Sequence, residues 1–384
     1  MTEVLTEKTA SRIQSIDILR GAVMVLMAID HVRVYSGLPA GGPTAGIFFT
    51  RWVTHFCAPA FVFFAGTSAF LYGRKVGASA LARYLLARGL LLVALELTAI
   101  RFAWTFNFDY AHFVLAGVIW MLGWCMVLLA GLVWLPTRAI AAIGLGIVFF
   151  QQAFRELPLA LPAQIRNSVG WIWEFLYPAG FKRWDGIAIL YVLIPWIGVM
   201  AAGYAFGAIM IREPNQRRRI CLKIGVSATL CFLVAGCLGV VLRPEQGDTR
   251  PILFQLLDQR KYPASQLFLL MTLGPTIALL PLAEHARGRL GGILATFGRV
   301  PMFYYLLHIP AIHIAGLVVT LLREGKVHPE WYAFAPFTSV PPEHRWGLPL
   351  LYLVFTLIVA ALYFACRWFA GIKARHRASW LRYL

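Results

Sequence analysis

Two histidines inside long apolar stretches are the residues best suited to chemistry in this sequence. His31 directly follows Asp30 near the end of residues 12–33, and His55 follows Arg51 by four residues in the next apolar stretch. An imidazole can serve as a general base or as a nucleophile. An ionisable side chain at a bilayer centre costs about 2.5–3.5 kcal/mol even on a lenient scale, and such groups commonly mark functional sites. We therefore take Asp30, His31, Arg51 and His55 as candidate catalytic residues.

Other helices are expected to bring further polar side chains to the same depth. Glu96 is a fifth candidate catalytic residue, because a carboxylate from another helix can orient an imidazole, and Asp109 is the alternative for that role. Tyr304 and His308 are four residues apart and share a helix face. The candidate substrate-side residues are Asp109, His112, Tyr304 and His308. Plainer interpretations remain open, with Glu96 in an interhelical ion pair and Tyr304 in bundle packing.

Four arginines are expected at the opposite end of the same helices. A guanidinium group binds phosphate through two parallel hydrogen bonds, so a ring of them suits a phosphorylated ligand such as coenzyme A. Taken one at a time, each is better explained as an anchor at the membrane surface. The candidate cofactor-binding residues are Arg20, Arg83, Arg88 and Arg299.

The composition assigns the chain to integral membrane proteins. Of its 384 residues, 60% are hydrophobic and only 14% are charged, whereas a soluble domain is about a quarter charged. The net charge of +18 predicts basic cytoplasmic loops and no nucleic-acid partner, because no soluble basic domain is present to bind one. The six cysteines lack metal-ligand spacing, and we expect no metal. P-loop, dinucleotide-binding and serine-hydrolase motifs are absent from the sequence.

The apolar stretches predict an all-α bundle of about ten transmembrane helices in a single domain spanning residues 1–384. Lys and Arg are more frequent in the segments that would be cytoplasmic if both termini were inside, which predicts that orientation. Residues 1–14 then form a cytoplasmic segment and residues 370–384 a basic cytoplasmic tail. Residues 156–186 suit a hairpin or an interfacial helix. The predicted spans are 15–36, 47–72, 80–104, 111–134, 138–155, 187–211, 220–242, 262–283, 293–322 and 347–369.

Three segments in the first half resemble a known family. They read SIDILRGAVMVLMAIDHVR, FFTRWVTHFCAPAFVFFAGTSAFL and RGLLLVALELTAIRFAW. Together they resemble the bacterial multi-pass proteins related to the heparan-α-glucosaminide N-acetyltransferase catalytic domain. A later segment, FGRVPMFYYLLHIP, is similar to late-helix motifs of related membrane acyltransferases.

The resemblance implies an acyltransferase of the inner membrane. Such an enzyme takes an acyl group, here an acetyl group from acetyl-CoA, at the cytoplasmic side and passes it to a hydroxyl or amine at the outer face. The lysosomal member carries its catalytic histidine between its first two spans, whereas residues 37–50 contain none. His31 and His55 flank this gap. The implied partners are the bilayer, acyl-CoA and an envelope glycan or small external acceptor, and a homodimer is left open.

Two other classes of protein use similar residues. A secondary transporter or proton-coupled permease can relay protons or bind a solute through intramembrane His, Asp and Arg groups. The sequence shows no inverted repeat, which weighs against that class. A non-catalytic scaffold would not need so many intramembrane charges.

Overall fold

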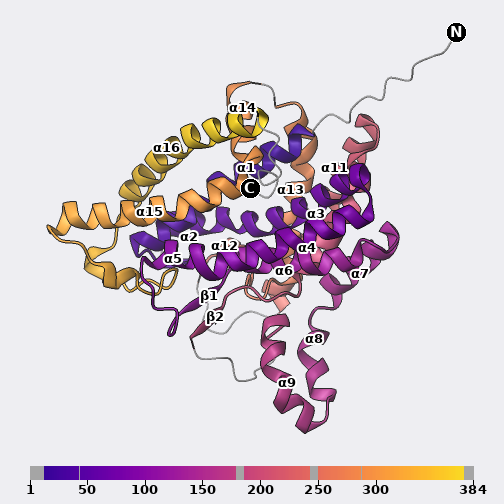
Figure 1. Cartoon of the computed structure of the whole chain (residues 1–384), viewed down its shortest axis with the longest axis horizontal. Coiled ribbons are helices and arrows are strands. Elements are labelled where there is room, and N and C mark those ends of the chain that lie inside the picture. Colours follow the sequence, from indigo (N-terminus) through magenta and orange to yellow (C-terminus); the bar gives the residue numbers. More distant parts are fainter. Residues whose placement is uncertain (1–12, 43, 179–185, 243–249, 287, 376–384) are drawn as a thin grey trace.

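A bundle of helices built around the first one is the architecture of this protein in a computed structural model (Figure 1). The structure describes residues 13–42, 44–178, 186–242, 250–286 and 288–375. The helices α1 to α16 in chain order are Gln14–Ser36, Ala45–Trp52, Cys57–Val76, Ala78–Leu95, Arg101–Thr105, Val118–Leu132, Thr137–Phe150, Ala153–Glu156, Ala163–Leu176, Trp196–Met210, Pro214–Leu242, Ile252–Leu257, Gln266–Glu284, Arg289–Arg299, Pro301–Glu324 and Leu348–Arg375.

Short irregular helices and two strands complete the fold. The strands β1 (Val114–Ala116) and β2 (Ile187–Ile189) pair in parallel, with Val114 opposite Ile187. A π-helical turn, η2 (Glu96–Ile100), joins α4 to α5. The 3₁₀ segments are η1 (Val53–Phe56), η3 (Leu157–Ala160), η4 (Pro329–Tyr332) and η5 (Pro342–His344).

Five helical segments in the described part of the chain are long and apolar enough to cross a membrane. A sixth is present if α7 and the following α8–η3 segment, bent by 72°, form one span. α6 and α10 are apolar but shorter, and α1 carries four charged side chains. The all-helical expectation is confirmed, whereas ten crossings and cytoplasmic termini stay predictions. The five segments are Ala45–Val76, Pro214–Leu242, Gln266–Glu284, Pro301–Glu324 and Leu348–Arg375.

The structure corrects the predicted span at residues 293–322, which consists of two helices. α14 ends at Arg299 and α15 begins at Pro301, with Val300 between them outside helical geometry. Proline lacks the N–H that would continue the preceding helix and suits the first helical position. Pro310, by contrast, lies inside α15 without ending it. The break allows α14 to pack against α1 independently of α15.

Two further predicted spans begin with strand and loop instead of helix. In the stretch 111–134 the helix α6 starts only at Val118, and in 187–211 the helix α10 starts only at Trp196. β1 and β2 occupy the initial residues, where each strand satisfies the other's backbone hydrogen bonds. Hydropathy alone cannot separate an apolar strand from an apolar helix.

A helical hairpin extends from the bundle at the bottom of Figure 1. It consists of α8, η3 and α9, as expected for residues 156–186, although 179–185 lie outside the described residues. The indole N–H of Trp173 donates to the carbonyl of Phe154 at 2.7 Å and ties the two arms together. The predicted terminal segments lie largely outside the description, which covers only residues 13–14 of the first and 370–375 of the second.

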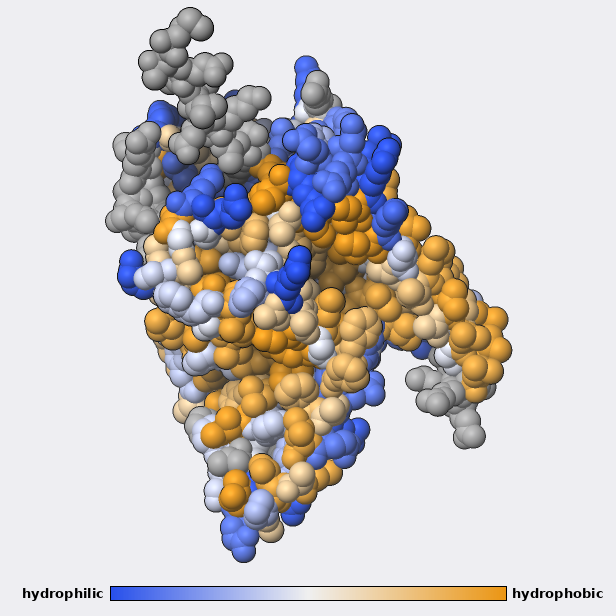
Figure 2. All heavy atoms as spheres, turned by 90° about the vertical axis from the view of Figure 1, so that its right-hand side faces the viewer, coloured by the Kyte–Doolittle hydropathy of each residue, from blue (hydrophilic) through white to orange (hydrophobic). Residues whose placement is uncertain are grey.

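Much of the surface is hydrophobic. Figure 2 shows a broad hydrophobic area across the visible face, with hydrophilic residues most numerous at the top and others along the lower right side and at the bottom. In α11 and in α16, only 17% of the most apolar stretch is buried. Both helices expose large side chains, such as Val234, Leu242, Phe364 and Trp368. A continuous exposed apolar surface of this kind suits contact with lipid.

Two glycines allow α1 and α14 to cross in direct backbone contact. A Cβ atom at Gly21 would lie 1.8 Å from the carbonyl oxygen of Leu294, and one at Gly298 would lie 1.9 Å from that of Asp17. Small residues permit such close approach between membrane helices. The contact fixes the N-terminal half of α1, and its C-terminal half carries the candidate site.

Candidate functional site

The C-terminal half of α1 meets two parts of the chain that are distant from each other in sequence, the continuous α2–η1 segment and α15. α1 ends at Ser36 because Gly37 adopts a left-handed conformation, with φ of 74°, that favours glycine. α1 contacts α2, η1 and α15. Side chains from all of these elements surround Asp30, His31 and Arg33.

His31 of α1 and His308 of α15 form a hydrogen-bonded pair. Nδ1 of His31 lies 2.7 Å from Nε2 of His308, and the ring centroids are 4.8 Å apart. Trp104 of α5 packs edge-on against His31 at 4.8 Å between centroids. His308 is fully buried, whereas His31 is partly exposed. Three helices therefore fix the orientation of the His31 ring.

The hydrogen bonds of this pair assign its tautomers. Nδ1 of His308 lies 2.7 Å from the carbonyl oxygen of Tyr305, which can only accept, so this nitrogen carries the proton. Nε2 of neutral His308 is then an acceptor and receives the Nδ1–H of His31. Nε2 of His31 is left with a lone pair and has no hydrogen-bond partner among the described residues. The pair thus presents one basic nitrogen, Nε2 of His31.

Asp30 binds two arginines. Its Oδ1 accepts from Nε of Arg33 at 2.9 Å, and its Oδ2 accepts from Nη1 of Arg51 at 2.8 Å. Arg33 also donates to the carbonyl of Leu38 at 2.6 Å, and Arg51 to the hydroxyl of Thr54 at 3.1 Å. The carboxylate of Asp30 therefore links α1 to α2 by charge.

His55 lies close to the same ion pairs in the short segment η1, between α2 and α3. It is buried against the ring of Phe268, with 5.4 Å between ring centroids, and its Nδ1 has no hydrogen-bond partner in the described structure. Asp30, Arg51 and Lys261 are near enough to interact with it electrostatically. A buried nitrogen without a partner needs an explanation, because an unsatisfied polar group costs about 1–3 kcal/mol.

Glu96 and Tyr304 make their contacts with groups other than Nε2 of His31. The carboxylate of Glu96 accepts hydrogen bonds from the backbone N–H groups of Gly117 and Ile119 at the start of α6. A negative charge is favourable at a helix N-terminus. Tyr304 stacks on His308 at 5.1 Å between centroids, and its buried hydroxyl has no partner in the part of the chain described.

Asp109 and His112 form an exposed pair in the loop between α5 and β1. Oδ1 of Asp109 lies 2.7 Å from Nδ1 of His112, and both side chains are about half exposed or more. The hydrogen bond from His112 lowers the pKa of the Asp109 carboxyl from its usual value. The buried guanidinium of Arg101 anchors this loop by donating to the carbonyls of Asn107, Asp109 and Phe113.

The four arginines predicted to bind a cofactor belong to two groups of helices. Arg20 donates to the hydroxyl of Ser68 at 2.7 Å and to the carbonyl of Gly298 at 3.4 Å, which places it beside the end of α14 where Arg299 lies. Arg83 and Arg88 lie on α4, where Arg88 donates to the hydroxyl of Tyr84 at 2.9 Å. Arg20 is eleven residues from His31, or about 16 Å along the helix axis.

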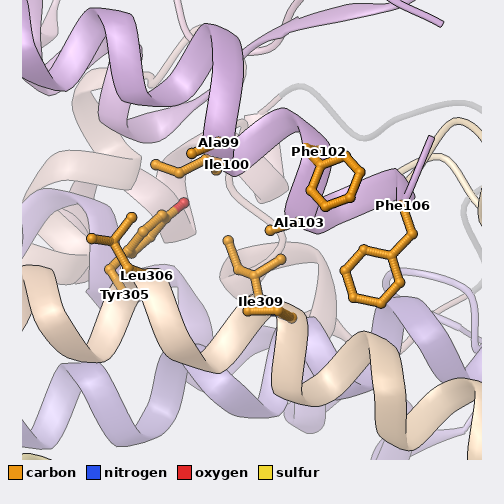
Figure 3. A pocket seen from close by; sticks show the side chains of 9 residues that line it. Ala99, Ile100, Phe102, Ala103, Phe106, Tyr305, Leu306 and Ile309 are labelled. Carbon is orange, nitrogen blue, oxygen red and sulfur yellow. The ribbon is translucent and has the colours of Figure 1, made fainter. Parts of the chain in front are cut away.

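An apolar pocket is lined by residues that flank His308 in α15. It has a volume of about 220 Å³ and lies between the η2–α5 segment and α15. Figure 3 shows the labelled side chains of the two segments facing one another across it. Tyr305 and Ile309 line it on either side of His308 in the sequence. The lining residues are Ala99, Ile100, Phe102, Ala103, Phe106, Tyr305, Leu306, Ile309 and Pro310.

Sequence reasoning missed several neighbours of the site. The sequence does not indicate that Trp104 contacts His31 or that Lys261 lies near the candidate catalytic residues. Lys261 is buried, and its ammonium lies 5.8 Å from the ring centroid of Tyr191 and 5.3 Å from that of Tyr262. The one available signal was a lysine directly before Tyr262 and Pro263 at the start of an apolar stretch, and it does not indicate burial.

Fold and site together define a multi-pass helical membrane protein with an ordered histidine pair at one end of its central helix. The catalytic-domain family of heparan-alpha-glucosaminide N-acetyltransferase matches residues 12–237. This range is more than half of the chain, and the protein belongs to that family. The match includes His31 and His55, but His308 and Lys261 follow it in the sequence. A comparison with curated proteins gives no match.

Proposed function

We propose that this protein transfers an acyl group from acyl-CoA to a hydroxyl or amine, with His31 as the catalytic base. The observation that carries the proposal is the free Nε2 of His31, whose lone pair follows from the hydrogen bond to His308. Membership in an acetyltransferase family supports the reaction class and an acetyl donor.

The proposed reaction is a direct transfer. Nε2 of His31 takes the proton of the acceptor hydroxyl or amine as the acceptor oxygen or nitrogen attacks the thioester carbonyl. The new bond forms at that carbon, the carbon–sulfur bond breaks, and the coenzyme A thiolate leaves. The proton on Nε2 then passes to the thiolate, which restores neutral His31. His308 holds the imidazole of His31 in the required tautomer throughout.

The donor is proposed to bind with its phosphates at the end of α1 that carries Arg20, near Arg299. Arginine is suited to phosphate because its planar guanidinium can form two parallel hydrogen bonds. The thioester arm then extends about 16 Å along α1 to reach His31. With the predicted ten spans and cytoplasmic termini, this arrangement puts the donor at the cytoplasmic face and the acceptor at the outer face of the inner membrane.

The test is acetyl-CoA binding and thiol release by the purified full-length protein, with water as the acceptor of the acetyl group. The variant His31→Gln should bind acetyl-CoA as the wild type does but release thiol about 100-fold more slowly, since general-base catalysis contributes about 10²–10⁴-fold. His285→Gln is the matched control, because His285 lies far from the candidate site. It follows the last residue of α13, whereas Phe268, which packs against His55, lies at the start of that helix. Wild-type protein that binds neither acetyl-CoA nor longer acyl-CoAs would contradict the proposal and favour transport.

A further inference from the structure

Three basic side chains lie around one carboxylate, that of Asp30, near His31 and His55. Arg33 and Arg51 both pair with Asp30, and Lys261 is near enough to interact with Asp30 electrostatically. The side chain of Arg33 is 10% exposed, that of Arg51 is 12% exposed and that of Asp30 is 17% exposed. Lys261 is 8% exposed when backbone and side chain are counted together. Among the described residues, the cluster therefore carries an excess of positive charge in a largely buried position.

Lys261 has no carboxylate partner in the described part of the chain. Its ammonium lies over the rings of Tyr191 and Tyr262, whose hydroxyl oxygens are 3.4 Å apart. Aromatic faces attract a cation but do not neutralise its charge. A buried charge normally requires a paired ion of opposite sign, because its removal from water costs several kcal/mol.

Hydrogen-bond donors converge at the same place. The guanidinium of Arg51 uses Nη1 for Asp30 and Thr54 and also faces the hydroxyl of Tyr262. Nδ1 of His55, which interacts electrostatically with Lys261, is buried without a partner. Tyr262 is 37% exposed, so the cluster reaches the surface on that side. Ammonium, guanidinium and phenol groups together match an oxyanion, which only accepts hydrogen bonds.

We propose that Lys261, Arg51 and Tyr262 bind the oxyanion group, phosphate or carboxylate, of an anionic acceptor. The inference deepens the proposed function, because it places the acceptor beside His31. Lys261 and Arg51 are near enough to His31 to interact with it electrostatically. The site is distinct from the proposed donor site, since Arg20 lies thirteen residues from Arg33 and about 20 Å away along α1.

Binding of simple anionic sugars to the purified full-length protein, without any acyl-CoA, tests the proposal. Glucosamine 6-phosphate and glucuronate are the probes, and neutral glucosamine is the reference, with affinities measured by calorimetry. At least one anionic probe should bind about tenfold or more tightly than glucosamine, because charge-assisted hydrogen bonds are the stronger ones. Competition by inorganic phosphate or by acetate then identifies which oxyanion the site prefers.

Variants of Lys261 connect that binding to the cluster. Lys261→Met should weaken the preferred anionic probe about tenfold or more, whereas Lys261→Arg, which keeps the charge, should stay within about threefold of wild type. Lys326→Met removes an exposed lysine after α15 and should have no effect. Loss of binding in Lys261→Met with retention in Lys261→Arg excludes simple misfolding.

The proposal is overturned if the wild type binds no anionic probe more tightly than glucosamine, or if Lys261→Met and Lys326→Met behave alike. These results do not depend on acyl transfer. A protein that binds an anionic sugar but releases no thiol from acyl-CoA contradicts only the proposed function.

Discussion

Nδ1 of His31 donates a hydrogen bond to Nε2 of His308 across 2.7 Å, although 277 residues separate the two in sequence. The second ring nitrogen of His308 is held by the carbonyl of Tyr305 in its own helix. The Tyr305 carbonyl in α15 therefore fixes the tautomer of His308, and His308 in turn fixes the tautomer of His31, which leaves the lone pair on Nε2 of His31. Second partners of this kind commonly set the tautomer of a working histidine.

Removing the partner should disturb the tautomer of His31 without preventing donor binding. In His308→Phe, neutral His31 is free to move its proton to Nε2, and we expect thiol release to fall about 10–100-fold at unchanged acetyl-CoA affinity. His308→Gln supplies an amide oxygen that can accept from Nδ1 and should recover part of the rate. Nitrogen-15 NMR of labelled histidine reports the tautomer directly. An unchanged His31 tautomer in His308→Phe would contradict the assignment.

The crossing of α1 and α14 should not tolerate a side chain. Gly298→Ala places a methyl group 1.9 Å from the carbonyl oxygen of Asp17, and we expect it to destabilise the protein by at least about 1–3 kcal/mol. Gly292→Ala is the control in the same helix, because a Cβ there meets nothing within 4 Å. Thermal unfolding in detergent compares the two. Equal unfolding midpoints would mean that the helices do not cross at Gly298.

Loss of the Arg101 guanidinium should loosen the loop between α5 and β1. Arg101→Met leaves the carbonyls of Asn107, Asp109 and Phe113 without their donor, and we expect a loss of about 2–4 kcal/mol of stability. Arg83→Met, at an exposed position of α4, should cost less than about 0.5 kcal/mol. Limited proteolysis should cut the loop faster in Arg101→Met only. Equal cleavage in both variants would show that Arg101 does not hold the loop.

The pair of Asp109 and His112 gives a pH-dependent signal. The hydrogen bond from His112 lowers the pKa of the Asp109 carboxyl. The stabilisation from this hydrogen bond is therefore fully present above the ordinary pKa of an aspartate, and it is lost as the pH falls through the lowered pKa of Asp109. In His112→Gln, the pKa of Asp109 should rise toward its usual value. Carbon-13 NMR of the Asp109 carboxyl over a pH titration measures it. His344→Gln, a substitution in the segment after α15, should leave the titration unchanged.

The amino-acid sequence determined the class of protein and most of its candidate residues. Long apolar stretches must leave water, and a continuous stretch of about 20 apolar residues satisfies its own backbone groups as a helix. Rare charged and imidazole side chains within those stretches identified His31, Asp30, Arg51 and His55 as candidates, because such groups are costly in a membrane. Motifs in the first half predicted the family that the matched range confirms.

Only the tertiary structure decided how those residues combine. Periodicity places a side chain on a helix face, but it does not say which distant helix lies opposite, so neither the His31–His308 pair nor the burial of Lys261 followed from the sequence. The sequence also did not predict the helix break at Val300 or the strand β1 before α6. Hydropathy reports burial in apolar surroundings, whereas these features depend on backbone hydrogen bonds and on contacts between segments remote in the chain.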